Sequence, residues 1–438
     1  MRTIAAIATP KGAGGIGIIR ISGPDALTIL QGVFTPFSGK IDARRMELGR
    51  LDTGVVRDVA LAVYFPAPHS FTGDNVAELH LHGGRLLMER ALAAVLEKGA
   101  SLAEPGEFTR TAFMNGKLAL SDAEGIADVI NADSEAALRS AYRLMSGELA
   151  STVRALNERL LMTTASMEVA FDYPEEMMDD LDTDGIRAEL IAVMNEIDAL
   201  IGTATRGRMI KDGISVAIVG STNAGKSSLL NKILRFDRAI VSNVPGTTRD
   251  TVEESVLYKG IKLNIIDTAG IRDSSDEIES IGITRSRRAA EGADCIILVI
   301  DGAKELTPND KELIAEYAGK NTVLAINKKD VWEKAILDGG IHVSAKTGEG
   351  VDDVLDAVIA RCDLGAEDSA MITSVRHEDA LKRAKTALCQ ALDGVGVLPH
   401  DCVAVDVRAA YFALGEITGE TSSEEITNTV FTKFCVGK

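Results

Sequence analysis

A nine-residue stretch near the middle of the chain, 220-GSTNAGKSS-228, places glycines, a lysine and serines at a spacing that suits phosphate binding. Its residues Gly220, Gly225, Lys226 and Ser227 satisfy the pattern G-x-x-x-x-G-K-[ST], with an apolar run before it and a helix-like segment after it. In such a loop the backbone N–H groups point at phosphate oxygens at the positive end of the following helix. We expect Lys226 to bridge the outer phosphates and the Ser227 hydroxyl to ligate Mg²⁺.

The tetrapeptide 327-NKKD-330 predicts the base of the nucleotide. The carboxylate of Asp330 can accept hydrogen bonds from the N1–H and the exocyclic amino group of guanine, whereas adenine offers neither donor in that arrangement. Alone, such a tetrapeptide is more often a surface turn. Because it follows both the phosphate-binding loop and 267-DTAG-270, it indicates GTP, and 344-SAK-346 is expected to complete the base pocket.

Two segments between these motifs are expected to respond to the γ-phosphate. Asp267 ends a strand-like run, where it can hold the metal through water, and the Gly270 N–H can contact the γ-phosphate. The segment 246-GTTRD-250 supplies Thr248 as the second hydroxyl on Mg²⁺. This segment and the polar stretch 271–280 have the character of mobile switches.

Asn223 stands three residues before the lysine of the phosphate-binding loop. One interpretation is loop chemistry, because asparagine tolerates tight turns. However, Ile271 occupies the place where a Ras-like protein has its water-orienting glutamine, and an apolar side chain cannot position water. The alternative is that the Asn223 carbonyl ligates a monovalent cation in the place of an arginine finger.

These motifs lie in a region that alternates strand-like and helix-like segments. The expected strands are 214–220, 262–270, 294–301 and 322–330, and the expected helices include 227–234 and 279–293. This alternation of strands and helices predicts a largely parallel sheet with helices on both faces. One hairpin is expected over 253–267, turning at Lys259-Gly260.

The regions around this module have a different character. Residues 119–212 are predicted to be helical, and residues 376–395 resume that character after the module. An apolar seam at heptad spacing, interpreted as a buried face between packed helices, consists of Leu149, Val153, Leu156, Leu160, Thr163 and Met167. Ser422 and Glu425 fit a capping box that opens a last helix.

The predicted fold is therefore multidomain: an α/β G domain of the P-loop, Ras-like type, inserted in an all-α helical domain and preceded by a mixed α+β domain. Strands are expected in that first domain at 15–22, 59–65 and 76–82. The predicted boundaries are 1–118, 119–212, 213–369 and 370–438.

Composition favours a globular cytoplasmic protein. The apolar runs are strand-sized, far short of the roughly 20 residues that span a bilayer, so no membrane partner is expected. The chain's start has neither the length nor the cleavage pattern of a secretory signal. Five scattered cysteines favour neither a disulfide framework nor a zinc site. A net charge of −18 argues mildly against RNA binding unless a local basic patch serves it.

The whole chain resembles the MnmE (TrmE) family of tRNA-modification GTPases. The resemblance rests on 9-TPKGAGGIGIIRISG-23, the phosphate-binding loop, 246-GTTRD-250 and the terminus 434-FCVGK-438. Thr222 departs from the proline usual in the loop. The resemblance implies K⁺-dependent GTP hydrolysis in a homodimer whose G domains pair. It also implies that, with a flavoprotein partner, MnmG, in a heterotetramer or larger assembly, the chain installs an aminomethyl- or carboxymethylaminomethyl-type group at C5 of the wobble uridine of certain tRNAs.

The same resemblance assigns the site residues. The expected GTP contacts are Asn223, Ala224, Gly225, Lys226, Ser227, Ser228, Ser242, Asn243, Val244, Pro245, Gly246, Thr247, Thr248, Asp267, Thr268, Ala269, Gly270, Asn327, Lys328, Asp330, Ser344, Ala345 and Lys346. The K⁺ ligands match Asn223, Ser242, Val244 and Thr247. Catalytic roles fall to Lys226 and to Glu279, which matches a glutamate that orients the attacking water.

The resemblance also implies that the first domain dimerises and binds 5,10-methylene- or 5-formyl-tetrahydrofolate. The matching folate positions are Arg20, Glu78, Lys117 and Lys438. Cys435 is a third catalytic candidate, and its alternative is a small buried residue.

Three weaker signals have simpler interpretations. Gly12-x-Gly14-x-x-Gly17 spells a dinucleotide fingerprint, but a strand is expected after it where the fingerprint needs a helix. Glu78, His80 and His82 alternate on one strand face, but they have no fourth ligand for zinc. The basic residues of 285–288 are typical of a solvated helix face.

Two other function classes share part of the pattern. A ribosome-assembly GTPase that acts as an RNA-binding switch would carry the same nucleotide motifs, usually followed by an RNA-binding module. A structural helical protein with a vestigial G domain would not hydrolyse GTP.

Overall fold

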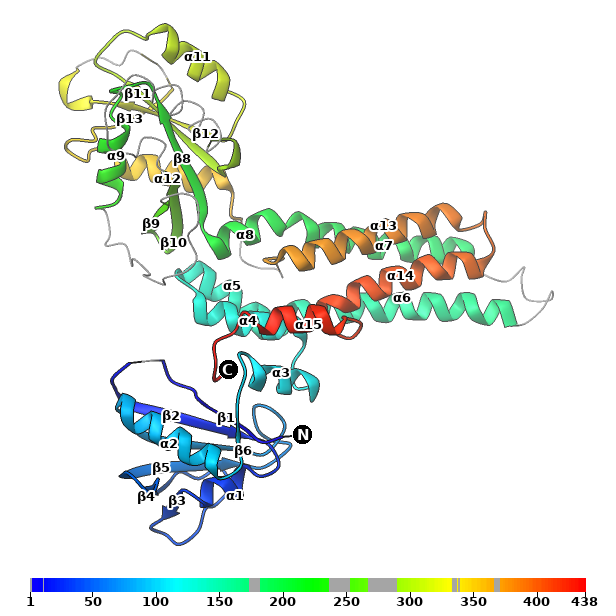
Figure 1. Ribbon diagram of the computed structural model, residues 1–438. Helices are drawn as coiled ribbons and strands as arrows, with labels where there is room; N and C mark the ends of the chain where they lie inside the picture. The colour runs from blue at the N-terminus through cyan, green and yellow to red at the C-terminus, as the bar shows by residue number, and fades with distance from the viewer. Residues whose placement is uncertain are drawn as a thin grey trace. The chain divides into compact units, whose positions relative to one another are not determined.

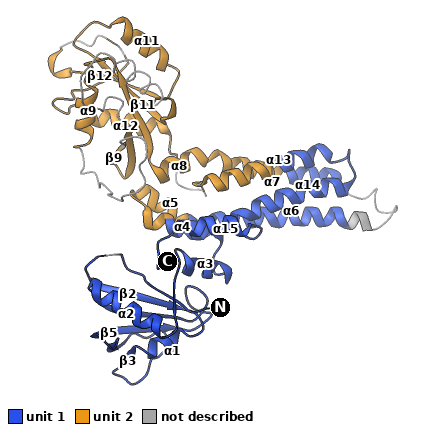
Figure 2. Ribbon diagram, viewed as in Figure 1, with its two compact units in different colours: residues 1–127, 144–190, 386–438 blue, residues 128–143, 191–385 orange. Residues whose placement is uncertain are grey.

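A computed structural model of the chain describes residues 2–10, 12–172, 182–235, 253–266, 290–332, 337, 339–365 and 371–438 (Figure 1). Over these residues, no helix is both long and apolar enough to cross a bilayer. The chain forms two compact units, one of residues 1–127, 144–190 and 386–438 and the other of residues 128–143 and 191–385 (Figure 2). The domain boundaries at 118, 212 and 369 stay predictions.

The first unit begins with a seven-stranded sheet in the order β3-β4-β5-β6-β2-β1-β7. Its strands are β1 (Ile4–Ile7), β2 (Gly14–Ser22), β3 (Phe34–Pro36), β4 (Glu47–Asp52), β5 (Arg57–Phe65), β6 (Val76–Gly83) and β7 (Ser101–Leu102). Helices α1 (Ala26–Gln31) and α2 (Arg85–Glu97) pack their apolar side chains on one face of this sheet (Figure 1). The three strands expected in this region are confirmed as β2, β5 and β6, so the segment after the glycine-rich stretch is a strand and not the helix that a dinucleotide fingerprint requires.

The other face of this sheet leaves large apolar side chains exposed. Along β4 and β5 burial alternates, and Leu48, Val59 and Leu61 are exposed. The strand register pairs Leu61 with His80 and Val63 with Glu78, so Glu78 lies on the same face as Leu61. This open face therefore combines an apolar area with titratable groups.

Helices make up most of the rest of the first unit and flank the α/β part of the second. They are α3 (Glu107–Met114), α4 (Leu120–Asn131), α5 (Glu135–Met145), α6 (Glu148–Asp172), α7 (Thr183–Gly202), α8 (Ala204–Asp212), α13 (Val375–Gly394), α14 (His400–Thr418) and α15 (Glu424–Phe431). Within the first unit, α6 and α14 pack side by side, although the whole α/β module separates them in sequence (Figure 1). All six residues of the heptad seam are buried. This confirms the interpretation of a packed helical face and of an inserted α/β domain.

The second unit contains a six-stranded sheet in the order β13-β12-β11-β8-β10-β9. Its strands are β8 (Ile214–Gly220), β9 (Glu253–Tyr258), β10 (Ile261–Ile266), β11 (Cys295–Asp301), β12 (Thr322–Asn327) and β13 (Ile341–His342). Among the described strands of this second sheet, only β9 and β10 pair antiparallel, which confirms the predicted hairpin. Helices α9 (Lys226–Ile233) and α12 (Val351–Cys362) pack on one face, and α11 (Pro308–Tyr317) packs on the other.

The prediction for the last helix is wrong by one residue. Helix α15 begins at Glu424, and Ser423, not Ser422, caps it by accepting a hydrogen bond from the Ile426 N–H. The Ser422 hydroxyl instead donates to the Gly419 carbonyl, at the end of α14. The expected structure over 267–289, including the basic residues of 285–288, lies outside the described residues.

Candidate functional site

The phosphate-binding loop joins β8 to α9, as predicted. Gly225 has φ +99°, and a Cβ there would lie 2.2 Å from the Asn327 Nδ2, so only glycine fits. Asn223 also has a positive φ, of 64°, and its side chain is exposed. The Lys226 Nζ donates to the carbonyls of Gly220 (2.8 Å) and Ser221 (3.0 Å), which places its ammonium group over the loop.

Asn327 connects the phosphate-binding loop to the base pocket. Its Nδ2 donates to the Ala224 carbonyl at 2.8 Å. Its Oδ1 accepts from the backbone N–H groups of Lys328 (2.7 Å) and Ala345 (3.0 Å). One buried amide therefore holds together three motifs that are far apart in the sequence.

Asp330 lies in the short 3₁₀ helix η2 (Lys329–Val331), directly after β12. The Ser344 hydroxyl donates to one oxygen of its carboxylate at 2.8 Å, and the Lys346 ammonium lies 3.8 Å from the other. The hydrogen bond from Ser344, helped by the nearby lysines, holds the pKa of Asp330 below its ordinary value. Asp330 is therefore an oriented carboxylate with lone pairs available for the donors of a purine edge.

Two contacts in this pocket were not foreseen. Lys328, at φ +69°, forms an ion pair with Asp301 at 2.7 Å. The indole N–H of Trp332 donates to the Asn327 carbonyl at 3.1 Å. Trp332 is the chain's one tryptophan, so its position after 327-NKKD-330 could have marked it as a residue of this site. Its bond to the Asn327 carbonyl, however, depends on the turn that η2 makes.

The other residues predicted for this site fall into two groups. Ser227 and Ser228 are exposed in the first turn of α9, where a metal-bound phosphate could reach Ser227. Outside the described residues lie Ser242, Asn243, Val244, Pro245, Gly246, Thr247, Thr248, Asp267, Thr268, Ala269, Gly270 and Glu279.

A second cluster lies on the open face of the N-terminal sheet. Arg20 donates to Glu78 at 2.9 Å, and His80 lies 3.4 Å from the same carboxylate. The nearby His80, together with the charge and hydrogen bond of Arg20, holds the pKa of Glu78 below its ordinary value. The Arg20 guanidinium also lies 5.7 Å and 5.8 Å from the rings of Phe71 and Phe108, at cation–π distance.

The C-terminal segment runs beside this cluster. The Gly437 carbonyl lies 3.5 Å from the Arg20 Nη1, and the Phe108 N–H donates to the Lys438 carbonyl at 3.3 Å. The backbone of the terminus is thus brought to Arg20 and Glu78, two of the predicted folate residues. Lys117 donates to the Pro68 carbonyl at 3.1 Å. Cys435 is exposed, so the alternative that it is a small buried residue is wrong.

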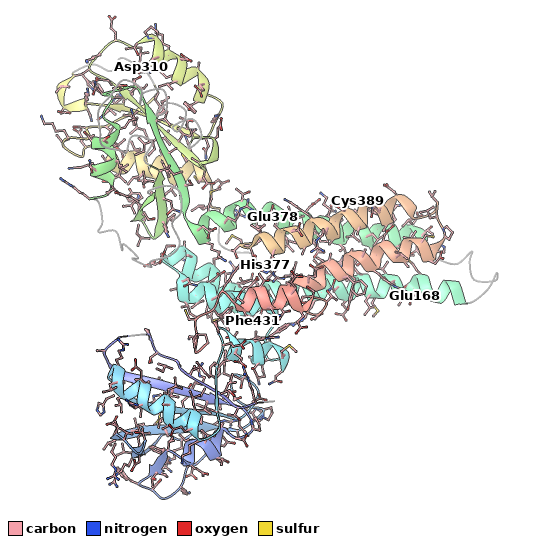
Figure 3. The ribbon with its side chains drawn as sticks, in the orientation of Figure 1. Glu168, Asp310, His377, Glu378, Cys389 and Phe431 are labelled. Carbon is pink, nitrogen blue, oxygen red and sulfur yellow. The ribbon has the colours of Figure 1, made fainter. Side chains whose placement is uncertain are left out.

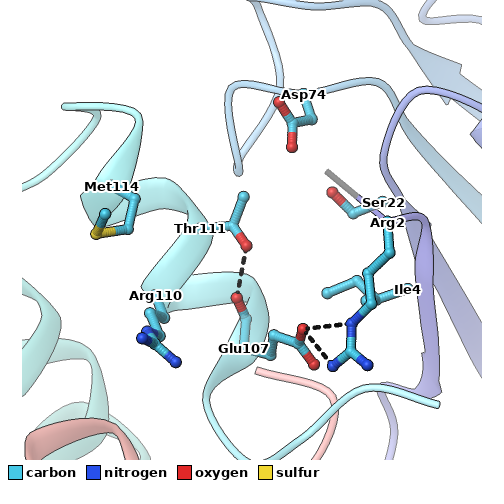
Figure 4. Close-up of a pocket in the computed structure, with 8 residues that line it drawn as sticks. All are labelled: Arg2, Ile4, Ser22, Asp74, Glu107, Arg110, Thr111 and Met114. Carbon is cyan, nitrogen blue, oxygen red and sulfur yellow. Dashed lines mark hydrogen bonds and ion pairs between the residues drawn. The ribbon is translucent and has the colours of Figure 1, made fainter. Parts of the chain in front are cut away.

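A cavity of about 240 Å³ lies on the same unit and is lined by Arg2, Ile4, Ser22, Asp74, Glu107, Arg110, Thr111 and Met114 (Figure 4). Glu107 forms an ion pair with Arg2 at 2.9 Å. The cavity therefore has charges of both signs. Helix α3 contributes to both the Arg20–Glu78 cluster and the cavity, because Phe108 lies against Arg20 and Glu107 lines the cavity.

The zinc interpretation gains no support from the part of the chain that is described. There, no group of three or more histidine, cysteine or acidic side chains is placed to hold a metal ion. His82 instead hydrogen-bonds through its Nδ1 to Asp58 at 2.8 Å.

Comparisons with known proteins cover the whole chain. A model described as the GTP-binding protein TrmE N-terminus matches residues 3–117, and one described as the MnmE helical domain matches residues 120–435. The tRNA modification GTPase MnmE of Roseiflexus sp. (strain RS-1) is 42% identical over 461 residues, covering 100% of this chain and 99% of the relative. The protein of the same name from Heliobacterium modesticaldum (strain ATCC 51547 / Ice1) is 41% identical over 464 residues, with the same coverage.

Among solved structures, the G domain of the T. maritima FeoB iron transporter is 27% identical and covers 34% of this chain and 98% of that one, with a TM-score of 0.26.

Proposed function

The chain belongs to the MnmE family of tRNA modification GTPases and is therefore a GTP hydrolase, and we propose that its phosphate-binding loop and the pocket around Asp330 are the GTP site. One observation carries this assignment. Asn327 fixes the loop through Ala224 and the base pocket through Ala345, so that the carboxylate of Asp330 is held in register with the phosphate cradle.

Specificity for guanine follows from the ionised state of the Asp330 carboxylate. A carboxylate with a lowered pKa only accepts hydrogen bonds, and guanine presents two donors on one edge. Adenine in the same place would offer no donors to the remaining lone pairs of the carboxylate, which costs free energy in a partly desolvated pocket.

Hydrolysis needs charge compensation at the γ-phosphate. Ser227, Thr248 and, through water, Asp267 would hold Mg²⁺, which neutralises charge on the phosphates. The exposed Asn223 fits a role as a K⁺ ligand, since its side-chain carbonyl hydrogen-bonds to none of the described residues and its own backbone has a positive φ. Ser242, Val244 and Thr247 would complete that site, and Glu279 would orient the attacking water.

The open face of the N-terminal sheet fits a folate and a second copy of the chain. Glu78 could accept from the amino group and ring N–H of a pterin, while Arg20, Lys117 and Lys438 offer positive charge to a glutamate tail. The exposed Leu48, Val59 and Leu61 on the same face supply apolar surface for a homodimer. Tetrahydrofolate would supply a one-carbon group.

The proposed biological role is modification of tRNA. With the flavoprotein MnmG, the chain would install an aminomethyl- or carboxymethylaminomethyl-type group at C5 of the wobble uridine, in the cytoplasm. Insertion of the G domain into the helical domain supports a coupling between hydrolysis and modification. Membership in the family decides against the ribosome-assembly switch and the vestigial G domain.

The comparison of GTP turnover in KCl and in NaCl tests this mechanism. We expect strong stimulation by KCl in the wild-type chain, because K⁺ takes the place of an arginine finger. Asn223→Ala should abolish the KCl/NaCl difference, whereas Thr222→Ala, a change in the adjacent exposed side chain, should retain it. An unchanged ratio in Asn223→Ala would refute the assignment of Asn223.

A further inference from the structure

The phosphate-binding loop has a side-chain contact outside the nucleotide motifs. The Ser221 hydroxyl, at the second position of the loop, is hydrogen-bonded to the carboxylate of Asp310 in the first turn of α11 (Asp310 is labelled in Figure 3). The side-chain amide of Asn309 donates to the same hydroxyl at 3.0 Å. Two consecutive residues of one helix thus hold one residue of the loop.

The side chain of Asp310 is held in one orientation by burial and by hydrogen bonds. It is only 6% exposed, and its second oxygen accepts from the N–H (2.9 Å) and the hydroxyl (2.7 Å) of Thr307 in a capping box. Burial alone would raise the pKa of Asp310, but the hydrogen bonds from Ser221 and Thr307 outweigh it and hold the pKa below its ordinary value. An ionised carboxylate only accepts, so the Ser221 hydroxyl is the donor and its proton points at Asp310.

Ser221 is also a junction of the loop's backbone. Its carbonyl accepts from the Lys226 ammonium at 3.0 Å and from the Ala224 N–H at 3.2 Å. At the other end of the loop, Ala224 is held by Asn327. The loop is therefore anchored on two sides, by α11 at Ser221 and by the base pocket at Ala224.

We propose that Ser221 and Asp310 are positioning residues for nucleotide binding, which preorganise the phosphate-binding loop from helix α11. This inference rests on the GTP site proposed above. Without the hydroxyl, the loop and the Lys226 ammonium would sample more orientations before phosphate binds, and ordering them would weaken affinity. Hydrogen bonds to charged groups are among the stronger ones in proteins, so a loss of about tenfold in affinity is expected.

The test is the dissociation constant of mant-GDP measured by fluorescence with the full-length chain. We expect Ser221→Ala and Asp310→Asn each to raise it about tenfold, and Ser221→Thr, which keeps the hydroxyl, to stay within about twofold of wild type. The double variant should bind no more than about twofold more weakly than the weaker single variant, because both changes remove the same hydrogen bond between a hydroxyl and a charged carboxylate.

Lys311→Gly is the matched control for the stability of α11. Lys311 is exposed in the same helical turn, so this change should lower the melting temperature while leaving mant-GDP affinity within about twofold. The inference is overturned if Ser221→Ala binds like wild type, if the two single effects multiply in the double variant, or if Lys311→Gly weakens binding as much as Ser221→Ala. A wild-type chain that binds no mant-GDP would overturn the proposed GTP site and the inference together.

Discussion

At the scale of single residues, the nucleotide site depends on side chains that each contact several partners. Asn327 hydrogen-bonds three backbone groups from three motifs, and Asp330 has its carboxylate oriented by Ser344. The role of Asp330 could be predicted from the sequence, because the chemistry of guanine requires an acceptor at that place, whereas the bonds by which Asn327 links the motifs were not predicted. The contacts of Trp332 with the Asn327 carbonyl and of Asp301 with Lys328 could not be predicted, because they depend on backbone turns that spacing does not determine.

Replacement of Asp330 by asparagine should change the preferred nucleotide. An asparagine amide offers a donor where the carboxylate accepts, and xanthine has a carbonyl where guanine has its amino group. We expect Asp330→Asn to lower kcat/KM for GTP by at least about 100-fold and to raise it for XTP. Glu349→Gln, which changes an exposed carboxylate paired with Lys329, should keep the preference for GTP. Equal loss of activity with both nucleotides would contradict the role given to Asp330.

The Arg20–Glu78–His80 cluster predicts a pH dependence of stability. The pKa of Glu78 is lowered in the folded chain, so its stabilising contribution is present above the ordinary pKa of glutamate, about 4.3, and is lost as the pH falls through the lower folded value. Urea unfolding between neutral pH and pH of about 3 should show a smaller loss of unfolding free energy for Glu78→Gln than for wild type. Parallel curves for the two proteins would show that the cluster does not stabilise the charged carboxylate.

At the scale of elements, the periodicity of apolar residues predicted helices and strands more accurately than local capping motifs predicted where a helix begins. The seam on α6 and the strands on either side of the phosphate-binding loop follow from the spacing of apolar residues, which burial enforces over many positions. The start of α15 differs by one residue, because Ser422 and Ser423 are both competent caps and the choice depends on how α14 ends. The contact between Ser221 and α11 joins segments 89 residues apart, and no local pattern encodes it.

The seam on α6 should carry a large part of the stability of the helical elements. Leu156 is 1% exposed, whereas Leu161, on the opposite side of the same helix, is 56% exposed. Leu156→Ala should lower the free energy of unfolding by about 2–5 kcal/mol, through lost apolar burial and the cavity left behind. Leu161→Ala should change it by no more than about 0.5 kcal/mol. Urea denaturation measures both, and equal effects would show that the face containing Leu156 is not the packed one.

At the scale of the whole molecule, one chain combines a nucleotide-hydrolysing module with helices that precede and follow it. The helices α6 and α14 pack together although β8 to α12 lie between them in sequence, so both ends of the inserted module connect to one helical structure. In the function proposed above, a change in the module on hydrolysis would reach the helices through these two covalent connections. This arrangement supports the proposal that a GTPase cycle drives a reaction on tRNA.

Mass spectrometry of wobble nucleosides in tRNA tests this central claim most directly, in cells that lack the chain and carry either the wild-type gene or Lys226→Ala. Wild type should restore the C5-substituted wobble uridine, and Lys226→Ala, produced at the same level, should leave that uridine unmodified because the outer phosphates lose their cation. Full restoration by a Lys226→Ala chain shown to be unable to hydrolyse GTP would contradict the coupling of hydrolysis to modification.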